Sequence, residues 1–299
     1  DNEDIYISDF DFSYFKNKNY LKVLKNSGVI FEHQKNTIRI KSGKYKLDDH
    51  IIFPEGVNLI IEPGVELNLF GSILVRGGLD IKGEATNSVY INLNEIEKNS
   101  SFIVLGKGDT KVKVSHAIFT GGSDTYVNGI HSSAAFMVDN SIVELTNTKI
   151  QNSIADDGLN LRNSQIILED SVFSDNAFDQ VDIDFSIGTI QNNLFSGKYS
   201  AEGDGLDLSG SSVNVLNNKF QKIDDKALSV GEKTTVCVYN NTFMDTKIGI
   251  ASKDASNVFE KDNKYFDVDS IHSVYLKKKM YQKAGVINNI SSIHEVECL

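Results

Sequence analysis

The sequence predicts an all-β fold, a parallel β-helix of roughly eleven coils, and three observations support this prediction. Aromatic residues recur at intervals of 22 to 25 residues along the second half of the chain. A short string of alternating apolar and polar residues recurs at the same intervals. The repeated region shows no amphipathic helical periodicity, and a repeat of this length that contains only strands indicates a β-solenoid.

The first repeated string ends in an aromatic residue. Its copies EDSVF, QNNLF, LNNKF, YNNTF and KDNKY end at Phe173, Phe195, Phe220, Phe243 and Tyr265. Two residues earlier, a turn position holds Ser171, Asn193, Asn218, Asn241 and Asn263. Equivalent residues of successive coils stack in columns, because each coil pairs with the next. Asparagine suits the turn column, since it tolerates left-handed backbone and its amide can bond to the next asparagine. The aromatic column is expected to fill the core.

The second repeated string is a strand with one buried face. Its copies are GLNLR (158–162), QVDID (180–184), GLDLS (205–209), ALSVG (227–231) and GIASK (249–253). Strict alternation of apolar and polar residues is typical of such a strand. Leucine-rich repeats have a similar length, but the Leu-x-x-Leu-x-Leu pattern that they require is missing from these strings.

The predicted β-helix covers residues 36–290, with an insertion between Phe119 and Ile150. Residues 1–35 do not fit the repeat, and we interpret them as an N-terminal cap with a short helix and a strand within 14–31. A cap is needed because the end of a solenoid exposes unpaired strands and an apolar cross-section. The segment from residue 276 onward is expected to cap the other end, and residues 291–299 form a C-terminal tail.

Composition narrows the range of partners. The net charge of −11, from 30 basic and 41 acidic side chains, disfavours nucleic acid and anionic membrane surfaces and favours metal cations or neutral polymers. No apolar run reaches the length of a membrane span, and the acidic N-terminus does not resemble a signal peptide. The two cysteines lack metal-binding spacing and exclude a fold stapled by several disulfides. Cys237, in the string VCVY, is expected to be a small core residue.

Several strings together resemble a known family. The NNxF strings, GVNLIIEPGVELNL (56–69) and GDGLDLSGSSV (203–213) are similar to right-handed parallel β-helix proteins of the carbohydrate-binding and sugar-hydrolase type, over residues 36–280. DGLDLSGS, DKALSVGE and GIASKD resemble β-helix domains of large bacterial surface proteins. The resemblance implies right-handed winding, polysaccharide as partner, an extracellular or cell-surface location and a place in a larger surface protein. Of the polygalacturonase motifs, only Asp156-Asp157 has a counterpart.

The outward positions of the second string form columns that are rich in carboxylates. One column reads Asn160, Asp182, Asp207, Ser229 and Ala251, and the other reads Arg162, Asp184, Ser209, Gly231 and Lys253. The turn before the strand contributes Asp157, Asp179, Asp204 and Lys226. Six carboxylates are therefore expected on one face over three coils. We call this set the aspartate wall: Asp157, Asp179, Asp182, Asp184, Asp204 and Asp207.

Three interpretations of the aspartate wall are open. Like charges about 5 Å apart repel by about 3 kcal/mol at an effective dielectric constant near 20, so the wall favours a cation. The first interpretation is a solvated face with turn aspartates and an exposed ion pair between Arg162 and Asp184. The second is a Ca²⁺ site, because calcium prefers hard oxygen ligands. Its candidate ligands are Asp157, Asp179, Asp182, Asp204 and Asp207. The third is an active site.

As an active site, the wall allows two kinds of chemistry. A calcium-assisted lyase or epimerase would use the metal to neutralise a uronate carboxylate and Arg162 or Lys226 as the base. A hydrolase would pair two carboxylates as acid and base. Without calcium, a neutral or amino-sugar glycan fits better than a polyuronate, which the wall would repel. The catalytic candidates are Asp182, Asp184, Asp207 and Arg162, with Lys226 as an alternative, and the substrate-binding candidates are Asn160, Lys253 and Tyr126.

Two classes of function follow from these candidates. One is an extracellular enzyme that acts on polysaccharide, lyase-like or hydrolase-like. The other is a non-catalytic structural or adhesion module that binds glycan or acts as a spacer. Coils of 22 to 25 residues leave little chain for the walls of a groove, and the insertion at 120–140 is the candidate flank. His116, His131 and His272 are interpreted as surface or turn histidines, because they show no recurring spacing.

Overall fold

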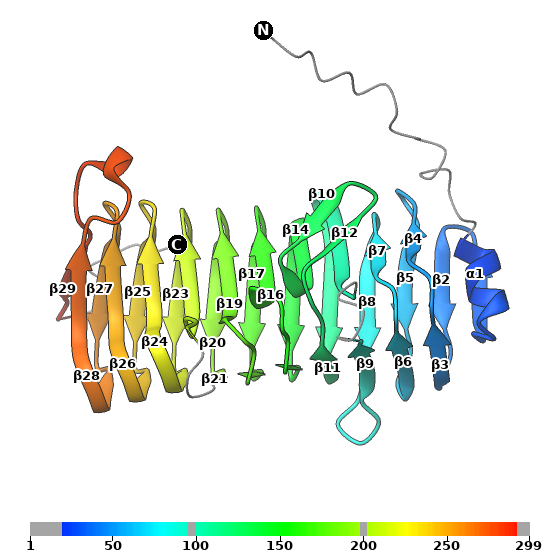
Figure 1. Ribbon diagram of the computed structural model, residues 1–299, viewed down its shortest axis with the longest axis horizontal. Coiled ribbons are helices and arrows are strands. Elements are labelled where there is room, and N and C mark those ends of the chain that lie inside the picture. The colour runs from blue at the N-terminus through cyan, green and yellow to red at the C-terminus, as the bar shows by residue number, and fades with distance from the viewer. Residues whose placement is uncertain (1–19, 95–99, 198–201, 292–299) are drawn as a thin grey trace, which may run out of the picture.

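The computed structural model describes residues 20–94, 100–197 and 202–291, which form a single rod (Figure 1). The described chain makes about ten turns of a parallel β-solenoid, where roughly eleven were predicted. Each turn adds one strand to each of three parallel sheets, which we call sheets one, two and three. The core lies between them.

The three sheets are built from strands that recur in chain order. Sheet one contains β4 (Ile51–Phe53), β7 (Ile73–Val75), β10 (Phe102–Ser115), β14 (Ala134–Thr146), β16 (Asp157–Arg162), β19 (Asp179–Asp184), β22 (Leu206–Ser209), β24 (Lys219–Gly231), β26 (Thr242–Lys253) and β28 (Lys264–Tyr275). Sheet two contains β2 (Thr37–Ile40), β5 (Asn58–Ile61), β8 (Leu79–Lys82), the second halves of β10 and β14, β17 (Gln165–Glu169), β20 (Ile187–Gln191), β23 (Ser212–Leu216), β25 (Thr235–Tyr239), β27 (Asn257–Lys261) and β29 (Val286–Asn289). Sheet three contains β3 (Gly43–Leu47), β6 (Val65–Leu69), β9 (Val89–Leu93), β11 (Ala117–Gly121), β15 (Lys149–Gln151), β18 (Val172–Ser174), β21 (Leu194–Ser196) and the first residues of β24, β26 and β28.

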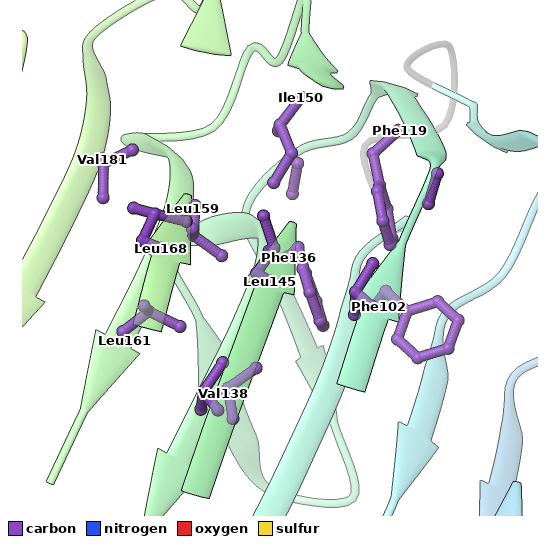
Figure 2. Packing of buried hydrophobic residues seen from close by; sticks show 14 of the residues in the cluster. Phe102, Phe119, Phe136, Val138, Leu145, Ile150, Leu159, Leu161, Leu168 and Val181 are labelled. Atoms are coloured by element: carbon purple, nitrogen blue, oxygen red, sulfur yellow. The ribbon is translucent and has the colours of Figure 1, made fainter. Parts of the chain in front are cut away.

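The predicted aromatic column fills one side of the core. Rings of successive coils stack at centroid distances of 4.7 to 5.3 Å, from Phe173 to Tyr265. Nearer the N-terminus, Phe102, Phe119 and Phe136 meet in the core beside aliphatic side chains (Figure 2). The rings of Phe119 and Phe136 stack at 4.8 Å, and Phe102 meets both edge-on. Both geometries suit the charge distribution of aromatic rings.

Buried asparagines hold the coils in register at one corner. This ladder begins at Ser171 and ends at Asn263. In each step, a backbone N–H donates to the Oδ1 of the asparagine one coil further along, at 2.8 to 2.9 Å. The left-handed backbone belongs to the preceding residues, such as Asn192 (φ 58°) and Asn217 (φ 56°). Tolerance of left-handed backbone and an amide that bonds to the next coil were both expected at one position. The structure places these two properties at neighbouring positions.

Hydroxyl side chains form a second ladder at another corner. Backbone N–H groups donate to the hydroxyl oxygen of the next coil at 3.0 to 3.1 Å, along the series Ser141, Ser164, Ser186, Ser211, Thr234 and Ser256. Turns between strands leave backbone N–H groups without a sheet partner. Buried groups of this kind need a hydrogen bond, and these small polar side chains supply it.

The N-terminal end of the core is covered by a helix and a strand. Helix α1 (Tyr20–Asn26) buries Leu24 completely and places the ring of Tyr20 at 5.5 Å from that of Phe53. Strand β1 (Phe31–Gln34) pairs antiparallel with β2. No helix in the described part of the chain is long and apolar enough to cross a membrane. Part of the predicted cap (1–19) and most of the predicted tail (292–299) lie outside the described residues. The predicted boundaries therefore stay predictions: 1–35 for the cap, 36–290 for the β-helix and 291–299 for the tail.

The C-terminal end of the core is polar. His272 pairs in register with the core residue Ile250, and its Nε2 lies 2.7 Å from Glu260 Oε1. The hydroxyl of Tyr265 donates to Glu260 Oε2 at 2.6 Å, and Glu260 is only 4% exposed. His272 is exposed, as the interpretation of it as a surface histidine predicted, although it lies in the inward column of the last coil. The chain then passes through a 3-10 helix (Lys279–Tyr281) into β29.

Cys237 is buried, as predicted, but on the outward side of its strand. Its neighbours Val236 and Val238 belong to the core, so Cys237 points outward from β25, although it is buried. All four residues of the string VCVY are apolar, so the sequence does not show which of these side chains point inward and which point outward.

The asparagine ladder makes a testable contribution to stability. Asn218→Ala is expected to lower the free energy of unfolding by about 2–5 kcal/mol, because buried partners lose their hydrogen bonds. Asn218 Oδ1 accepts from the backbone N–H of Asn193, and its Nδ2 donates to the carbonyl of Ile190. Urea unfolding followed by circular dichroism measures the change. The matched control is Asn214→Ala, on the outward side of β23, with an expected loss below about 0.5 kcal/mol. Equal losses for both would contradict a special role of the ladder.

Candidate functional site

Three adjacent strands of sheet one carry the aspartate wall. The register places Asn160, Asp182 and Asp207 side by side on β16, β19 and β22, followed by Ser229 and Ala251. Arg162 lies beside Asp184, and Asp157 lies beside Asp179. The inward residues of these strands are fully buried in the core. Because side chains alternate along a strand, the polar residues between them must project outward.

The closest carboxylates belong to Asp179, Asp204 and Asp207. One oxygen from each lies within 4.8 Å of the other two. The backbone N–H of Asp204 donates to Asp179 Oδ1 at 2.6 Å, which fixes one of these oxygens in place. Asp157 and Asp204 are buried, whereas Asp179 and Asp207 are partly open to solvent. The arrangement offers three hard oxygen ligands from two adjacent coils.

Asn160 holds the neighbouring pair of carboxylates. Its Nδ2 donates to Asp182 Oδ2 at 3.0 Å and to Asp184 Oδ2 at 3.3 Å. Asn160 is only 2% exposed, and its Oδ1 has no hydrogen-bond partner among the described residues. Asp182 and Asp184 therefore share one donor, which lies one coil closer to the N-terminus.

Burial makes several of these carboxyl groups retain protons. It raises the pKa of Asp157 to about 7, and Asp156 and Asp184 contribute to the shift. Burial also raises the pKa of Asp179 to about 8, assisted by the charge of Asp204. The pKa of Asp182 lies well above its ordinary value, through burial and the charges of Asp157 and Asp184. Ionised carboxylates are costly to bury unless a cation lies beside them.

Two lysines from later coils neutralise part of this charge. Lys226 Nζ lies 2.9 Å from Asp204 Oδ1 and also contacts Asp225. Burial by itself would lower the pKa of Lys226, but these carboxylates outweigh it and raise that pKa. Lys253 Nζ lies 3.6 Å from Asp207 Oδ1 and donates to Ser229 Oγ at 2.7 Å. Both lysines are therefore paired cations.

Arg162 does not form the predicted ion pair with Asp184. Its Nη2 lies 3.7 Å from Asp139 Oδ2 and 3.3 Å from the sulfur of Met137. Asp139 is the register partner of Arg162 on β14, so the arginine turns away from the wall towards the preceding coil. Of the three predicted basic neighbours, only the two lysines contact aspartate-wall carboxylates among the described residues.

The insertion predicted as a flank forms a small hairpin beside the wall. Strands β12 (Thr125–Val127) and β13 (Ile130–Ser132) pair antiparallel and lie over β10 and β14 (Figure 1). Tyr126 is on this hairpin, away from the aspartates themselves. Ser133, which follows the hairpin, donates from Oγ to Asp157 Oδ2 at 2.9 Å. The hairpin therefore borders the first coil of the wall.

A separate groove of about 630 Å³ lies on another face. It runs over the outward side of sheet two, where Asn58, Asp80 and Lys111 contribute to its lining, and it includes no residue of the wall. Its lining mixes both signs of charge: Lys107 pairs with Glu55 inside the groove, and Lys113 pairs with Glu144 beside it. We therefore place the candidate site at the wall, where unbalanced charge gathers.

Sequence reasoning missed the partners that surround the wall. Asp139, Ser133 and Asp225 each contact a predicted site residue. Asp139 stands one coil before Arg162 in the same column, so extending the column would have found it. Ser133 lies in the insertion, outside the repeat, and no periodic signal points to it.

The sequence and the structure were compared with known proteins. A family model described as "Right handed beta helix region" matches residues 133–289. No curated protein matches the sequence. Among solved structures, a mutant periplasmic alginate epimerase is 10% identical, with 85% of each chain covered and a TM-score of 0.44. A tailspike of an Acinetobacter phage is 10% identical, with a TM-score of 0.41 and coverage of 85% of this chain and 57% of the tailspike.

An alginate lyase from Paenibacillus sp. is 11% identical, with a TM-score of 0.39 and coverage of 74% of this chain and 92% of the lyase. At such identities these likenesses concern the fold. The family model covers more than half of the chain, and its description gives the winding of the solenoid. The chain therefore belongs to the right-handed β-helix family.

Proposed function

We propose that this chain binds polysaccharide along sheet one and that the aspartate wall holds Ca²⁺ as part of that binding. The observation that carries the proposal is the convergence of Asp179, Asp204 and Asp207, whose oxygens lie within 4.8 Å of one another. Calcium takes six to eight oxygen ligands, and carboxylates are its usual protein ligands. Sugar hydroxyl and carboxylate groups are oxygen ligands of the same kind, so a glycan could complete the coordination.

The donor set fits a hard divalent cation. All three ligands are carboxylates, and Asp157 and Asp182 are the neighbouring candidates. Six carboxylates face two paired lysines, because Arg162 is engaged by Asp139. A divalent cation would remove much of the remaining repulsion, and the buried carboxyl groups would then no longer need protons. Asn160 and Lys253, at the two edges of the wall, are 2% and 4% exposed, so in this proposal they position carboxylates and do not contact the glycan directly.

The extended shape of the wall favours a polymer over a small ligand. Successive coils repeat at about 4.8 Å, which is similar to the length of one pyranose unit. The wall spans three coils, so it presents similar groups to successive sugar units. An extracellular or cell-surface location, within a larger surface protein, belongs to the same proposal.

Hydrolysis is a second candidate function, which the environment of Asp182 favours. A carboxyl group with a raised pKa can keep its proton at neutral pH and act as a general acid. Asp184 or Asp207 would then serve as the base. Lys226 is less suited to abstract a proton, since its pKa is raised by its carboxylate partners, and Arg162 is held by Asp139. Among enzymatic alternatives, a hydrolase is therefore favoured over a lyase or epimerase.

Removing two charges from the wall tests the calcium proposal. In Asp182→Asn/Asp207→Asn, Ca²⁺ affinity is expected to fall at least about tenfold, equal to about 1.4 kcal/mol, because ligand charge is lost. Isothermal titration of chelator-treated protein with CaCl₂ measures the affinity. The matched control is Asp109→Asn/Asp170→Asn, which removes two exposed charges elsewhere. Equal affinity in both double variants, or no binding of Ca²⁺ by the wild type, would refute the calcium site.

The raised pKa values predict how stability depends on pH in chelator. Asp157 and Asp179 bind protons more tightly in the folded than in the unfolded chain, so folding takes up protons between the unfolded and folded pKa values. Stability should therefore fall as pH rises from about 4 to about 8. The Tm at about pH 8 should lie at least about 5 °C below that at about pH 5. In the double variant Asp157→Asn/Asp179→Asn the difference in Tm between the two pH values should shrink. An unchanged difference would contradict the raised pKa values of Asp157 and Asp179.

Catalysis has its own test. If the wall is an active site, wild-type protein should release oligosaccharides from at least one member of a polysaccharide panel, as detected by mass spectrometry. Asp182→Asn should reduce release at least about a hundredfold, within the usual contribution of a general acid. Asp170→Asn should leave it unchanged. Activity that survives Asp182→Asn would exclude Asp182 as the acid.

A further inference from the structure

The β12–β13 hairpin has one buried and one exposed face. Thr125, Val127 and Ser132 are buried, whereas Tyr126 and His131 point to solvent and pair across the two strands. The turn is the dipeptide Asn128-Gly129, with φ values of 52° and 75°. Positive φ at both positions is typical of the tight turn that best fits the twist of a hairpin. The hairpin therefore presents two ring side chains on one outward face.

A small apolar cluster fixes the hairpin to the rod. Val127 packs with Leu74, Ile103 and Met137, which are outward residues of sheet one, and Ile130 adds to the contact. Ser132 Oγ lies 2.9 Å from Ser101 Oγ at the base of the hairpin. These contacts hold both strands on the scaffold. A ligand that binds to the exposed face would thus find an ordered surface and cost little conformational entropy.

The exposed rings form a platform. Tyr126 is 72% exposed, and its ring centroid lies 4.7 Å from that of His131 at an interplanar angle of 34°. The neighbouring histidine restricts the orientation of the tyrosine ring. An exposed aromatic ring on an ordered element can stack against a flat ligand.

The platform continues into the aspartate wall. The backbone N–H of Asp156 donates to Asp124 Oδ1 at 3.1 Å, next to the first strand of the wall. Ser133, at the other end of the hairpin, donates to Asp157. One glycan chain could therefore contact both the platform and the wall.

We propose that Tyr126 and His131 form a subsite that stacks a pyranose ring carrying a free amino group. The subsite lies beside the aspartate wall, and the inference rests on the polysaccharide site proposed there. The carboxylate of Asp124 lies 3.8 Å from His131 Nε2, and Asp156 is exposed next to it. The face of a tyrosine ring attracts cations, and the neighbouring carboxylates attract an ammonium group further. A uronate in the same position would be repelled by both carboxylates.

Amino-sugar oligomers test the subsite directly. A glucosamine hexamer is the probe, titrated calorimetrically in chelator at low salt, so that calcium does not contribute. Tyr126→Ala should weaken binding at least about tenfold, whereas Tyr126→Phe should retain it because the ring face remains. The matched control is Tyr90→Ala, which removes a tyrosine that is 43% exposed on sheet three and should leave affinity unchanged.

Matched ligands test the role of charge. The N-acetylated hexamer should bind more weakly than the free amine, and a galacturonate hexamer should bind most weakly. Wild-type affinity in Tyr126→Ala, a preference for the galacturonate hexamer, or no binding of the glucosamine hexamer would each overturn the proposal. The calcium affinity of Tyr126→Ala should equal that of the wild type. The Tyr126 variants therefore test the amino-sugar subsite alone. The calcium site is tested separately by the variants of the aspartate wall.

Discussion

The hydrogen bonds that fix one coil on the next are the constraint on which the rest of this structure depends. The buried asparagine and hydroxyl ladders join backbone N–H groups to side chains 22 to 25 residues away, so they determine which residues of adjacent coils lie side by side. A slip of one residue would turn every outward carboxylate of a strand into the core. Asp182 and Asp207 are neighbours only because the ladders exclude that slip.

Periodicity accounts for what the sequence predicted well. The aromatic column and the order of the wall residues follow from repeats, since equal positions in equal coils must stack. Features outside the repeat were harder to predict. The hairpin was seen only as an insertion, although Asn128-Gly129 is a recognised turn signal. Arg162 pairs with Asp139, which lies one coil earlier in the same column, so extending the column would have identified this partner. Cys237 faces outward because side chains alternate along β25, which the wholly apolar string VCVY does not reveal.

The wall shows how a solenoid can tolerate buried charge. A single enclosed carboxylate without a partner would be costly. In this solenoid, carboxylates recur on successive coils, and each coil supplies a different kind of partner. Asn160 donates at the N-terminal edge, Lys226 and Lys253 pair at the C-terminal edge, and the middle carboxyl groups carry raised pKa values. Protons, lysines and any metal ion therefore compete for the same oxygens. Such a face is sensitive to its ionic surroundings, whereas the apolar core behind it is not.

The polar group of Glu260, Tyr265 and His272 has a consequence for how the rod behaves among its own copies. An apolar end on a stack of parallel strands would act as a template on which another molecule could continue the stack. Here the last described coil places a charged residue and two polar rings beside Val274, which is 49% exposed, where further side chains would have to dock. A strand that paired with this coil would have to bury the carboxylate of Glu260 and the polar atoms of both rings, which makes such pairing costly.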